Sequence, residues 1–186
     1  MRRLKLASVD LLLIHWPPKD PAEFEPVLER LAAAQDEQLA RLIGVSNYAA
    51  CQLGQAKRLL GSRLACNQVE FHPYLDQSRL VEAARATGVP LAAYSSVARG
   101  KVLTDPVITG IAHRVHRSPA AVVLRWILQQ GVIAVCQASK RSNVESNFEA
   151  LSFELDAADM AAISQLRSRQ LRVVELPELA PDWDRD

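Results

Sequence analysis

The chain of 186 residues is predicted to adopt an α/β fold built on a parallel β-sheet. Short apolar runs recur along it with little polar alternation, which is typical of strands buried on both faces of a sheet. Longer segments with helical spacing of apolar residues separate these runs, and this order indicates βαβ units. The hydrophobic content of 49% and the chain length are sufficient for one domain with a sizeable core.

The strands are expected at residues 9–14, 42–45, 66–71, 91–94 and 132–136. The helices are expected at residues 26–41, 49–60, 77–87, 118–130, 143–151 and 156–167. Leu28 and Leu31 lie near helical spacing in the first helix, and glycines at positions 61, 88 and 131 are suited to end three others. Ser118 and Asp156 are expected to cap two helices, with Pro119 at a favourable first helical position. We expect a single domain over residues 1–186, with residues 171–186 as an extended tail.

The composition excludes several classes of protein. With 22 basic and 21 acidic residues, the net charge of +1 predicts no binding to nucleic acid or to an anionic membrane. Three cysteines without a CxxC pair predict neither a disulfide framework nor a zinc site, and we expect no other metal site. The apolar run 9–14 is too short for a signal peptide or a membrane span. We therefore expect a cytoplasmic protein.

Polar and aromatic side chains cluster where the predicted strands end, which is where parallel α/β folds place their chemistry. A stacking ring with amide and hydroxyl groups suits a flat heteroaromatic ligand that carries an amide. The hydroxyl and basic side chains at residues 139–141, just before a helix, suit a phosphate. Each residue also has a structural alternative, because a single histidine after a strand is more often packed or hydrogen-bonded than catalytic. The sequence contains no GxGxxG and no GxxxxGK[ST] motif.

Several segments together resemble the aldo-keto reductase family. They are DLLLIHWP at 10–17, RLIGVSNY at 41–48, CNQVEFHPY at 66–74, AYSS at 93–96, the stretch 147–155 and APDWD at 180–184. They follow the order of the family and cover nearly all of the chain. The sequence is most similar to the bacterial 2,5-diketo-gluconate and methylglyoxal reductases.

The resemblance implies a (β/α)8 TIM barrel, of which this chain would form strands four to eight with their helices. Such a barrel typically takes ~250 residues, so the resemblance also implies a chain truncated at its amino terminus. An open five-stranded parallel α/β sheet is the alternative arrangement.

The resemblance also implies roles for individual residues. His15 would be the catalytic histidine that orients the substrate, Trp16 would line the substrate pocket, and Tyr94 would stack on the nicotinamide ring. The nicotinamide carboxamide would be held by Ser46, Asn47 and Gln68.

The other cofactor-binding residues implied are Ser95 near the pyrophosphate, Asn147 at the adenine, and Gln137, Ala138, Ser139, Lys140 and Arg141. NADPH is the expected cofactor. Gln137 and Asn143 stand where many members carry a lysine and an arginine for the 2′-phosphate, so NADH is the alternative. Lys140 and Arg141 remain as candidates to supply the positive charge.

The implied activity is NADPH-dependent hydride transfer to an aldehyde, a ketone or a ketoaldose, all small-molecule carbonyl substrates. The family's catalytic Asp, Tyr and Lys have no counterpart here, because none of the tyrosines at 48, 74 and 94 matches the proton donor. We therefore expect the chain alone to be inactive or very weak. The alternatives are a nucleotide-binding remnant without activity and a module that assembles with other chains. Self-association is expected through open strand edges at 9–14 and 132–136.

Overall fold

The computed structural model describes residues 5–183, which form two compact units. The first unit contains residues 5–69, 78–91 and 175–183 of the described chain, and the second contains residues 70–77 and 92–174. The predicted α/β fold is confirmed, because parallel strands connected by helices make up both units.

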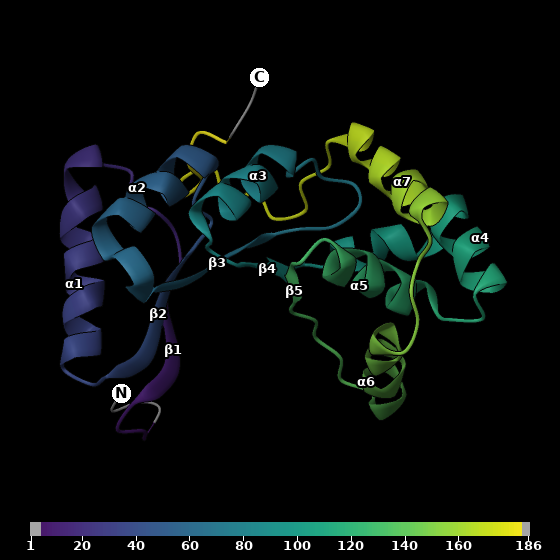
Figure 1. Cartoon of the computed structure of the whole chain (residues 1–186), viewed down its shortest axis with the longest axis horizontal. Helices are drawn as coiled ribbons and strands as arrows, with labels where there is room; N and C mark the ends of the chain where they lie inside the picture. The colour runs from purple at the N-terminus through teal and green to yellow at the C-terminus, as the bar shows by residue number, and fades with distance from the viewer. Residues whose placement is uncertain (1–4, 184–186) are drawn as a thin grey trace. The chain divides into compact units, whose positions relative to one another are not determined.

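Three parallel strands form the sheet of the first unit, in the order β1 (Val9–Ile14), β2 (Ala40–Ser46) and β3 (Leu64–Glu70). In the register, Leu11 lies beside Leu42 and Ser46 beside Gln68. The helices are α1 (Phe24–Asp36), α2 (Ala50–Leu60) and α3 (Ser78–Thr87), and α1 and α2 lie alongside this sheet (Figure 1). Short 3-10 segments at Pro21–Glu23 and Gly61–Arg63 complete the unit.

The first helix ends earlier than the sequence predicts. α1 stops at Asp36, and Gln38 then adopts a left-handed backbone with a φ of 60°. The chain enters β2 at Ala40, so the predicted helix over residues 26–41 is wrong beyond residue 36. Leu39 and Leu42 match helical spacing in the sequence, but Leu39 lies in the turn after α1 and Leu42 lies in β2. By contrast, Gly61 ends α2 as predicted, with a φ of 57°.

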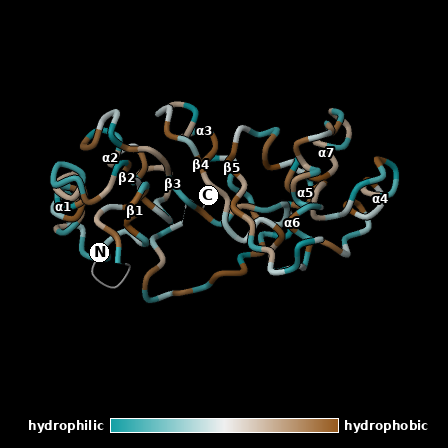
Figure 2. Tube along the Cα trace, turned by 90° about the horizontal axis from the view of Figure 1, so that it is seen from below, coloured by the Kyte–Doolittle hydropathy of each residue, from teal (hydrophilic) through white to brown (hydrophobic). Residues whose placement is uncertain are grey.

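The core of the first unit lies between the sheet and these helices. Ile43 and Val45 of β2 are fully buried, as are Leu53 and Ala56 of α2. Helix α1 contributes Leu28 and keeps polar residues on its other side, so hydrophobic and hydrophilic segments alternate along it (Figure 2). Burial of this one apolar face is what holds each helix on the sheet.

The second unit pairs β4 (Leu91–Tyr94) with β5 (Ile133–Ala134) in parallel. β4 has the bounds that the sequence predicts, whereas β5 is shorter than the run 132–136. The helices of this unit are α4 (Pro106–Arg114), α5 (Pro119–Gln129), α6 (Arg141–Phe148) and α7 (Ala157–Gln165). Its 3-10 segments are Ala98–Thr104, Glu149–Leu151 and Leu166–Arg169.

Side-chain caps begin α4, α5 and α7 of the second unit. The Ser118 side chain accepts a hydrogen bond from the Ala121 amide, and Asp156 accepts one from the Asp159 amide, which confirms both predicted caps. Helix α4 was not predicted, although Asp105 caps it in the same way. α5 lies deepest in this unit, and its Val122, Val123 and Ile127 are fully buried.

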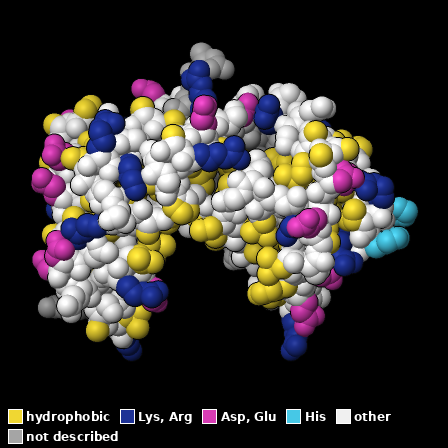
Figure 3. All heavy atoms as spheres, viewed as in Figure 1, with side chains coloured by type: hydrophobic (Ala, Val, Ile, Leu, Met, Phe, Trp, Pro, Cys, Tyr) yellow, Lys and Arg dark blue, Asp and Glu magenta, His cyan; other side chains and the backbone are white. Residues whose placement is uncertain are grey.

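The described residues show no helix that is long and apolar enough to cross a membrane. Over the same residues there is no group of three or more His, Cys, Asp or Glu side chains placed to bind a metal ion. The cysteines Cys51, Cys66 and Cys136 are free thiols. On the face shown in Figure 3, acidic and basic side chains are interspersed, in keeping with a net charge of +1.

Candidate cofactor and substrate site

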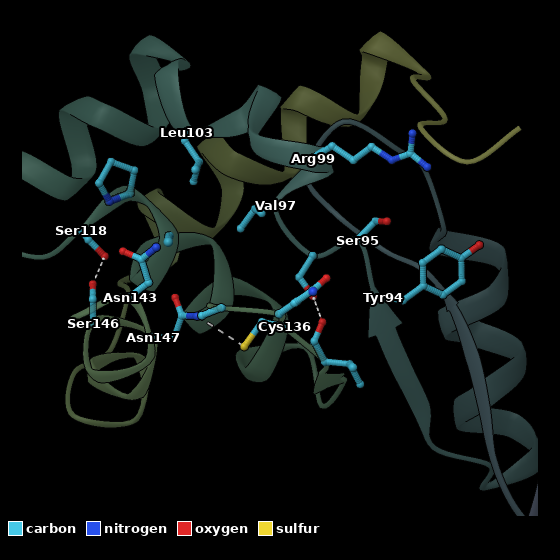
Figure 4. A pocket seen from close by; sticks show the side chains of 16 residues that line it. Tyr94, Ser95, Val97, Arg99, Leu103, Ser118, Cys136, Asn143, Ser146 and Asn147 are labelled. Carbon is cyan, nitrogen blue, oxygen red and sulfur yellow. Dashed lines mark hydrogen bonds between the residues drawn. The ribbon is translucent and has the colours of Figure 1, made fainter. Parts of the chain in front are cut away.

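A cavity of about 740 Å³ opens in the second unit where β4 and β5 end (Figure 4). It is lined by residues 94–97, Arg99, Leu103, 118–120, 135–138, Asn143, Ser146 and Asn147. The walls therefore come from the turns after both strands, from the start of α5 and from α6. A volume of this size lies within the range of small-molecule sites.

The turn after β4 positions Tyr94 and Ser95 at the cavity. Tyr94 is the last residue of β4, and Ser95 follows with a left-handed backbone at a φ of 51°. The buried Ser96 hydroxyl lies 3.0 Å from the carbonyl oxygens of both Ala93 and Val135. This hydroxyl ties the end of β4 to the end of β5, which fixes the two turns that line the cavity.

Neutral polar groups form the opposite wall. The Ser146 hydroxyl lies 2.7 Å from that of Ser118, and the Asn147 amide donates to the Cys136 sulfur at 3.6 Å (Figure 4). Ser118 both caps α5 and lines the cavity, and the sequence indicated only the first role. Ser146 was missed, because it lies inside a helix and no motif marks it.

Five predicted cofactor residues line this cavity, namely Tyr94, Ser95, Gln137, Ala138 and Asn147. The predicted Ser139, Lys140 and Arg141 are not among the described residues that line it. The Arg141 side chain is exposed and forms an ion pair with Glu145 at 2.7 Å. Arg99, which no sequence motif indicates, contributes a positive charge to the described part of the wall.

The other predicted site residues lie in the first unit, at the ends of its three strands. The Ser46 hydroxyl donates to the Gln68 carbonyl at 2.7 Å, and the Asn47 amide N–H donates to the same carbonyl at 2.9 Å. The Asn47 side chain donates to the His15 carbonyl at 2.9 Å. Asn47 holds a left-handed backbone with a φ of 62°, which asparagine tolerates better than most residues. The three strand ends are thus connected by hydrogen bonds.

His15 and Trp16 follow β1 directly, and the His15 side chain is exposed. Their ring centroids are 6.0 Å apart, and Trp183 packs against Trp16 at 6.2 Å. Lys19 donates to the carbonyl oxygens of Pro177 and Ala180. Within the first unit, the last described segment therefore lies against the loop after β1. Asp184 of the motif at 180–184 lies outside the described residues.

The three tyrosines all have a phenol pKa above the ordinary value. Burial raises the pKa of Tyr48 well above its usual range. Burial and the Asp105 carboxylate raise the pKa of Tyr74 to about 12. Burial and the Glu70 carboxylate raise the pKa of Tyr94 to about 12, although the Arg172 guanidinium opposes the effect. Each environment therefore favours the neutral phenol.

Comparison with known proteins shows the family. Residues 1–168 match the model of the Aldo/keto reductase family. Methylglyoxal reductase DkgB of Escherichia coli O157:H7 is 38% identical over 186 residues, which is 99% of this chain and 69% of that protein. Glyoxal reductase of Bacillus subtilis is 36% identical over 166 residues, which is 89% of this chain and 59% of that protein.

Solved structures agree with this assignment. A protein provisionally described as a 2,5-diketo-D-gluconic acid reductase B superimposes with a TM-score of 0.92 at 38% identity, covering 99% of this chain and 66% of that one. A variant of Gox0644 in complex with NADPH superimposes with a TM-score of 0.81 at 32% identity, covering 89% of this chain and 61% of that one. The chain thus spans 59–69% of the length of these relatives. Over that length its fold is that of their TIM barrel, and the chain belongs to the aldo/keto reductase family.

Proposed function

We propose that this chain carries the cofactor-binding part, and the histidine of the substrate site, of an NADPH-dependent reductase of small aldehydes, ketones or ketoaldoses. The cavity at the ends of β4 and β5 is the observation that carries the proposal, because five cofactor residues implied by the family resemblance surround it. The names of the relatives suggest methylglyoxal and glyoxal as substrates to try first.

The residues present fit a nicotinamide dinucleotide. The Tyr94 ring at the end of β4 offers a stacking face for the nicotinamide. The ring lies on the side of the Tyr94 backbone that is opposite to Ser118 and Asn143 (Figure 4). Hydroxyl and amide groups on the other wall would hold the nucleotide, with Asn147 at the adenine. In the first unit, Ser46, Asn47 and Gln68 would hold the carboxamide, while His15 and Trp16 would orient the substrate carbonyl. When bound, the reduced nicotinamide supplies a hydride to the carbonyl carbon.

We propose NADPH rather than NADH as the main donor. Relatives of known structure hold NADPH or NADP, among them the Gox0644 variant and an aldo-keto reductase of Bombyx mori. Gln137 and Asn143 are neutral, so the positive charge for a 2′-phosphate would come from Lys140 and Arg141, which lie between the lining residues Ala138 and Asn143 in the sequence. NADH remains the alternative, because neither basic side chain lines the cavity.

None of the three tyrosines, at 48, 74 and 94, is a suitable donor of the proton to the carbonyl oxygen. A catalytic acid works best with a pKa near the working pH, whereas all three tyrosines have a pKa raised away from it. The Tyr74 hydroxyl is also committed to the Asp105 carboxylate at 2.8 Å. We therefore propose that a polypeptide of these residues binds the cofactor but turns over at least ~10²-fold more slowly than a complete enzyme of the family.

Fluorescence titration with NADPH, followed by a methylglyoxal turnover assay on the same sample, tests this proposal. We expect saturable binding with little NADPH oxidation, and we expect Tyr94→Ala to weaken the binding. Val144→Ala is the matched control, because Val144 is exposed on α6 and does not line the cavity. Failure of the chain to bind NADPH or NADH would disprove the cofactor proposal. Rapid turnover would disprove the argument about the proton donor.

A further inference from the structure

Residues 167–174, which we call the strap, follow α7 and lie against residues 70–76 of the same unit. The Leu171 amide donates to the Tyr74 carbonyl at 2.8 Å. At the start of the strap, Arg167 pairs with Asp76 at 3.6 Å in a partly exposed ion pair. Two further attachments involve buried carboxylates, and these distinguish the strap from an ordinary surface segment.

The first buried carboxylate is Asp105, whose side chain is 1% exposed. Its Oδ2 accepts hydrogen bonds from Arg169 at 2.6 Å and from the Tyr74 hydroxyl at 2.8 Å. The Arg169 guanidinium also lies over the Tyr74 ring, 4.2 Å from its centroid. The other oxygen, Oδ1, accepts from the Val107 amide at 2.9 Å and caps α4. Asp105 therefore fixes the early part of the strap.

The second buried carboxylate is Glu70, whose side chain has no exposed surface. Its Oε1 accepts from the Val173 amide at 2.6 Å and lies 2.8 Å from His72 Nε2. Its Oε2 accepts from the Val174 amide at 3.1 Å and lies 4.0 Å from the Arg172 guanidinium. One carboxylate thus binds two successive amides of the strap together with the neighbouring cation.

The Glu70 attachment borders Tyr94, the residue proposed to stack on the nicotinamide. The Phe71 amide, next to Glu70, donates to the Tyr94 carbonyl at 3.2 Å. The Glu70 carboxylate and the Arg172 guanidinium are both close enough to the phenol to change its pKa, in opposite directions. Asp105 is not among the groups that shift the pKa of Tyr94. The two anchors of the strap therefore differ in whether they act on the proposed site.

We propose that Glu70 is a positioning residue for the nicotinamide end of the site: by binding Arg172, Val173 and Val174, it holds the strap beside Tyr94 and keeps that ring in place. The inference rests on the proposed function, because only the cofactor proposal gives Tyr94 a role. Glu70 itself is buried and acts through its neighbours.

Two matched substitutions distinguish a role of Glu70 in positioning Tyr94 from a role in attaching the strap alone. In Glu70→Gln, one oxygen becomes an NH2 group that cannot accept hydrogen bonds, and Arg172 loses its counter-charge. In Asp105→Asn, the remaining oxygen can still cap α4, but Arg169 loses its partner. Both variants are expected to loosen the strap, which faster hydrogen exchange at residues 171–174 would reveal. Of the two variants, only Glu70→Gln is expected to alter the surroundings of Tyr94.

The test compares the binding of NADPH with that of 2′,5′-ADP, a fragment that lacks the nicotinamide, to the 186-residue chain. Fluorescence titration gives the affinity for NADPH, and displacement of NADPH gives the affinity for the fragment. We expect Glu70→Gln to weaken NADPH binding about tenfold with no change for 2′,5′-ADP. We expect Asp105→Asn to leave the ratio of the two affinities at the wild-type value.

Several results would overturn the inference. One is an equal loss of affinity for NADPH and for 2′,5′-ADP in Glu70→Gln. Another is a change in the ratio of these two affinities in Asp105→Asn that equals the change in Glu70→Gln. The third is a wild-type chain that binds NADPH no more tightly than 2′,5′-ADP. If Glu70→Gln does not fold, Arg172→Gln removes the same ion pair from the strap side and is expected to shift the ratio in the same direction. An unchanged ratio in Arg172→Gln would then be decisive against the inference. Absence of binding by the wild type to either ligand would instead refute the proposed function.

Discussion

Gly44 lies where β2 passes very close to its neighbours in the first unit. A Cβ atom at this position would be 2.8 Å from the Cys66 carbonyl oxygen and 2.8 Å from the Leu13 Cδ2 atom. The Cys66 carbonyl is backbone in β3, so it cannot move without disturbing the sheet. We expect Gly44→Ala to lower the free energy of unfolding by about 2 kcal/mol, the size of a typical overpacking penalty. Urea denaturation followed by circular dichroism measures this.

Gly54 is the control for the Gly44 substitution. It lies inside α2, and a Cβ atom there would meet only the Arg58 guanidinium at 3.9 Å. Alanine has the better helix propensity, so Gly54→Ala is expected to raise the free energy of unfolding by about 0.5–1 kcal/mol. Effects of the same sign for both substitutions would show that the close approach of β2 to its neighbours does not determine the result.

The attachment of the strap depends on one titrating group, the Glu70 carboxylate, which binds Val173, Val174 and Arg172. Burial alone would raise the pKa of Glu70, but hydrogen bonds from His72, Val173 and Val174 and the charge of His72 outweigh it and lower the pKa overall. A carboxyl group with a lowered pKa in the folded state stabilises that state above its unfolded pKa of about 4.3. This contribution is lost as the pH falls through the lower folded pKa.

We therefore expect the strap to detach under acidic conditions before the rest of the second unit unfolds. The measurement is the hydrogen-exchange protection factor of residues 171–174 at pH 7 and at successively lower pH, compared with that of buried α5. The groups facing Glu70 are His72, Arg172 and Tyr94. Glu70→Gln removes the titrating group, so its strap is expected to be poorly protected at every pH. Loss of strap and α5 protection together would contradict a local release.

Some helix ends could be predicted, because a cap depends on residues close to it in the sequence. Ser118 with Pro119 and Asp156 are local signals, and each begins its helix as expected. The end of α1 was misjudged, because Gln38 takes the left-handed conformation without being a glycine. The strap attachments could not be foreseen, since Glu70 and Val173 are 103 residues apart in the sequence. The same limit applies to the cavity: motifs marked Tyr94, Ser95 and Asn147, but nothing local marked Ser146.

At the scale of the whole molecule, the proposed function assigns cofactor-binding groups to this chain but no acid with a pKa near the working pH. The cavity lies wholly in the second unit, while His15 and the three strand ends around it lie in the first. The proposed cofactor cavity and the proposed substrate histidine are therefore supplied by different segments of the polypeptide. Under the proposed function, this chain binds the cofactor but turns over slowly, so binding can be measured without turnover. In a complete enzyme of the family, the bound cofactor would also be oxidised by the substrate.

The outer strand of the first unit also has a consequence for the molecule as a whole. In the described chain, β1 ends the order of strands and pairs only with β2. Leu11 and Leu42 are neighbours in that pairing, and they are 40% and 42% exposed. An open parallel edge beside an exposed apolar pair is a template for pairing with another chain.

We therefore expect the purified chain to self-associate in a concentration-dependent way, and Leu11→Lys to reduce this association. A lysine on an edge strand hinders pairing, because its charge would have to be buried against a second strand. Sedimentation velocity over a range of protein concentrations measures the effect. Leu59→Lys is the matched control, since Leu59 is 44% exposed but lies on α2, away from the edge. A monomer at all concentrations, or an equal effect of the two lysines, would show that the β1 edge does not drive association.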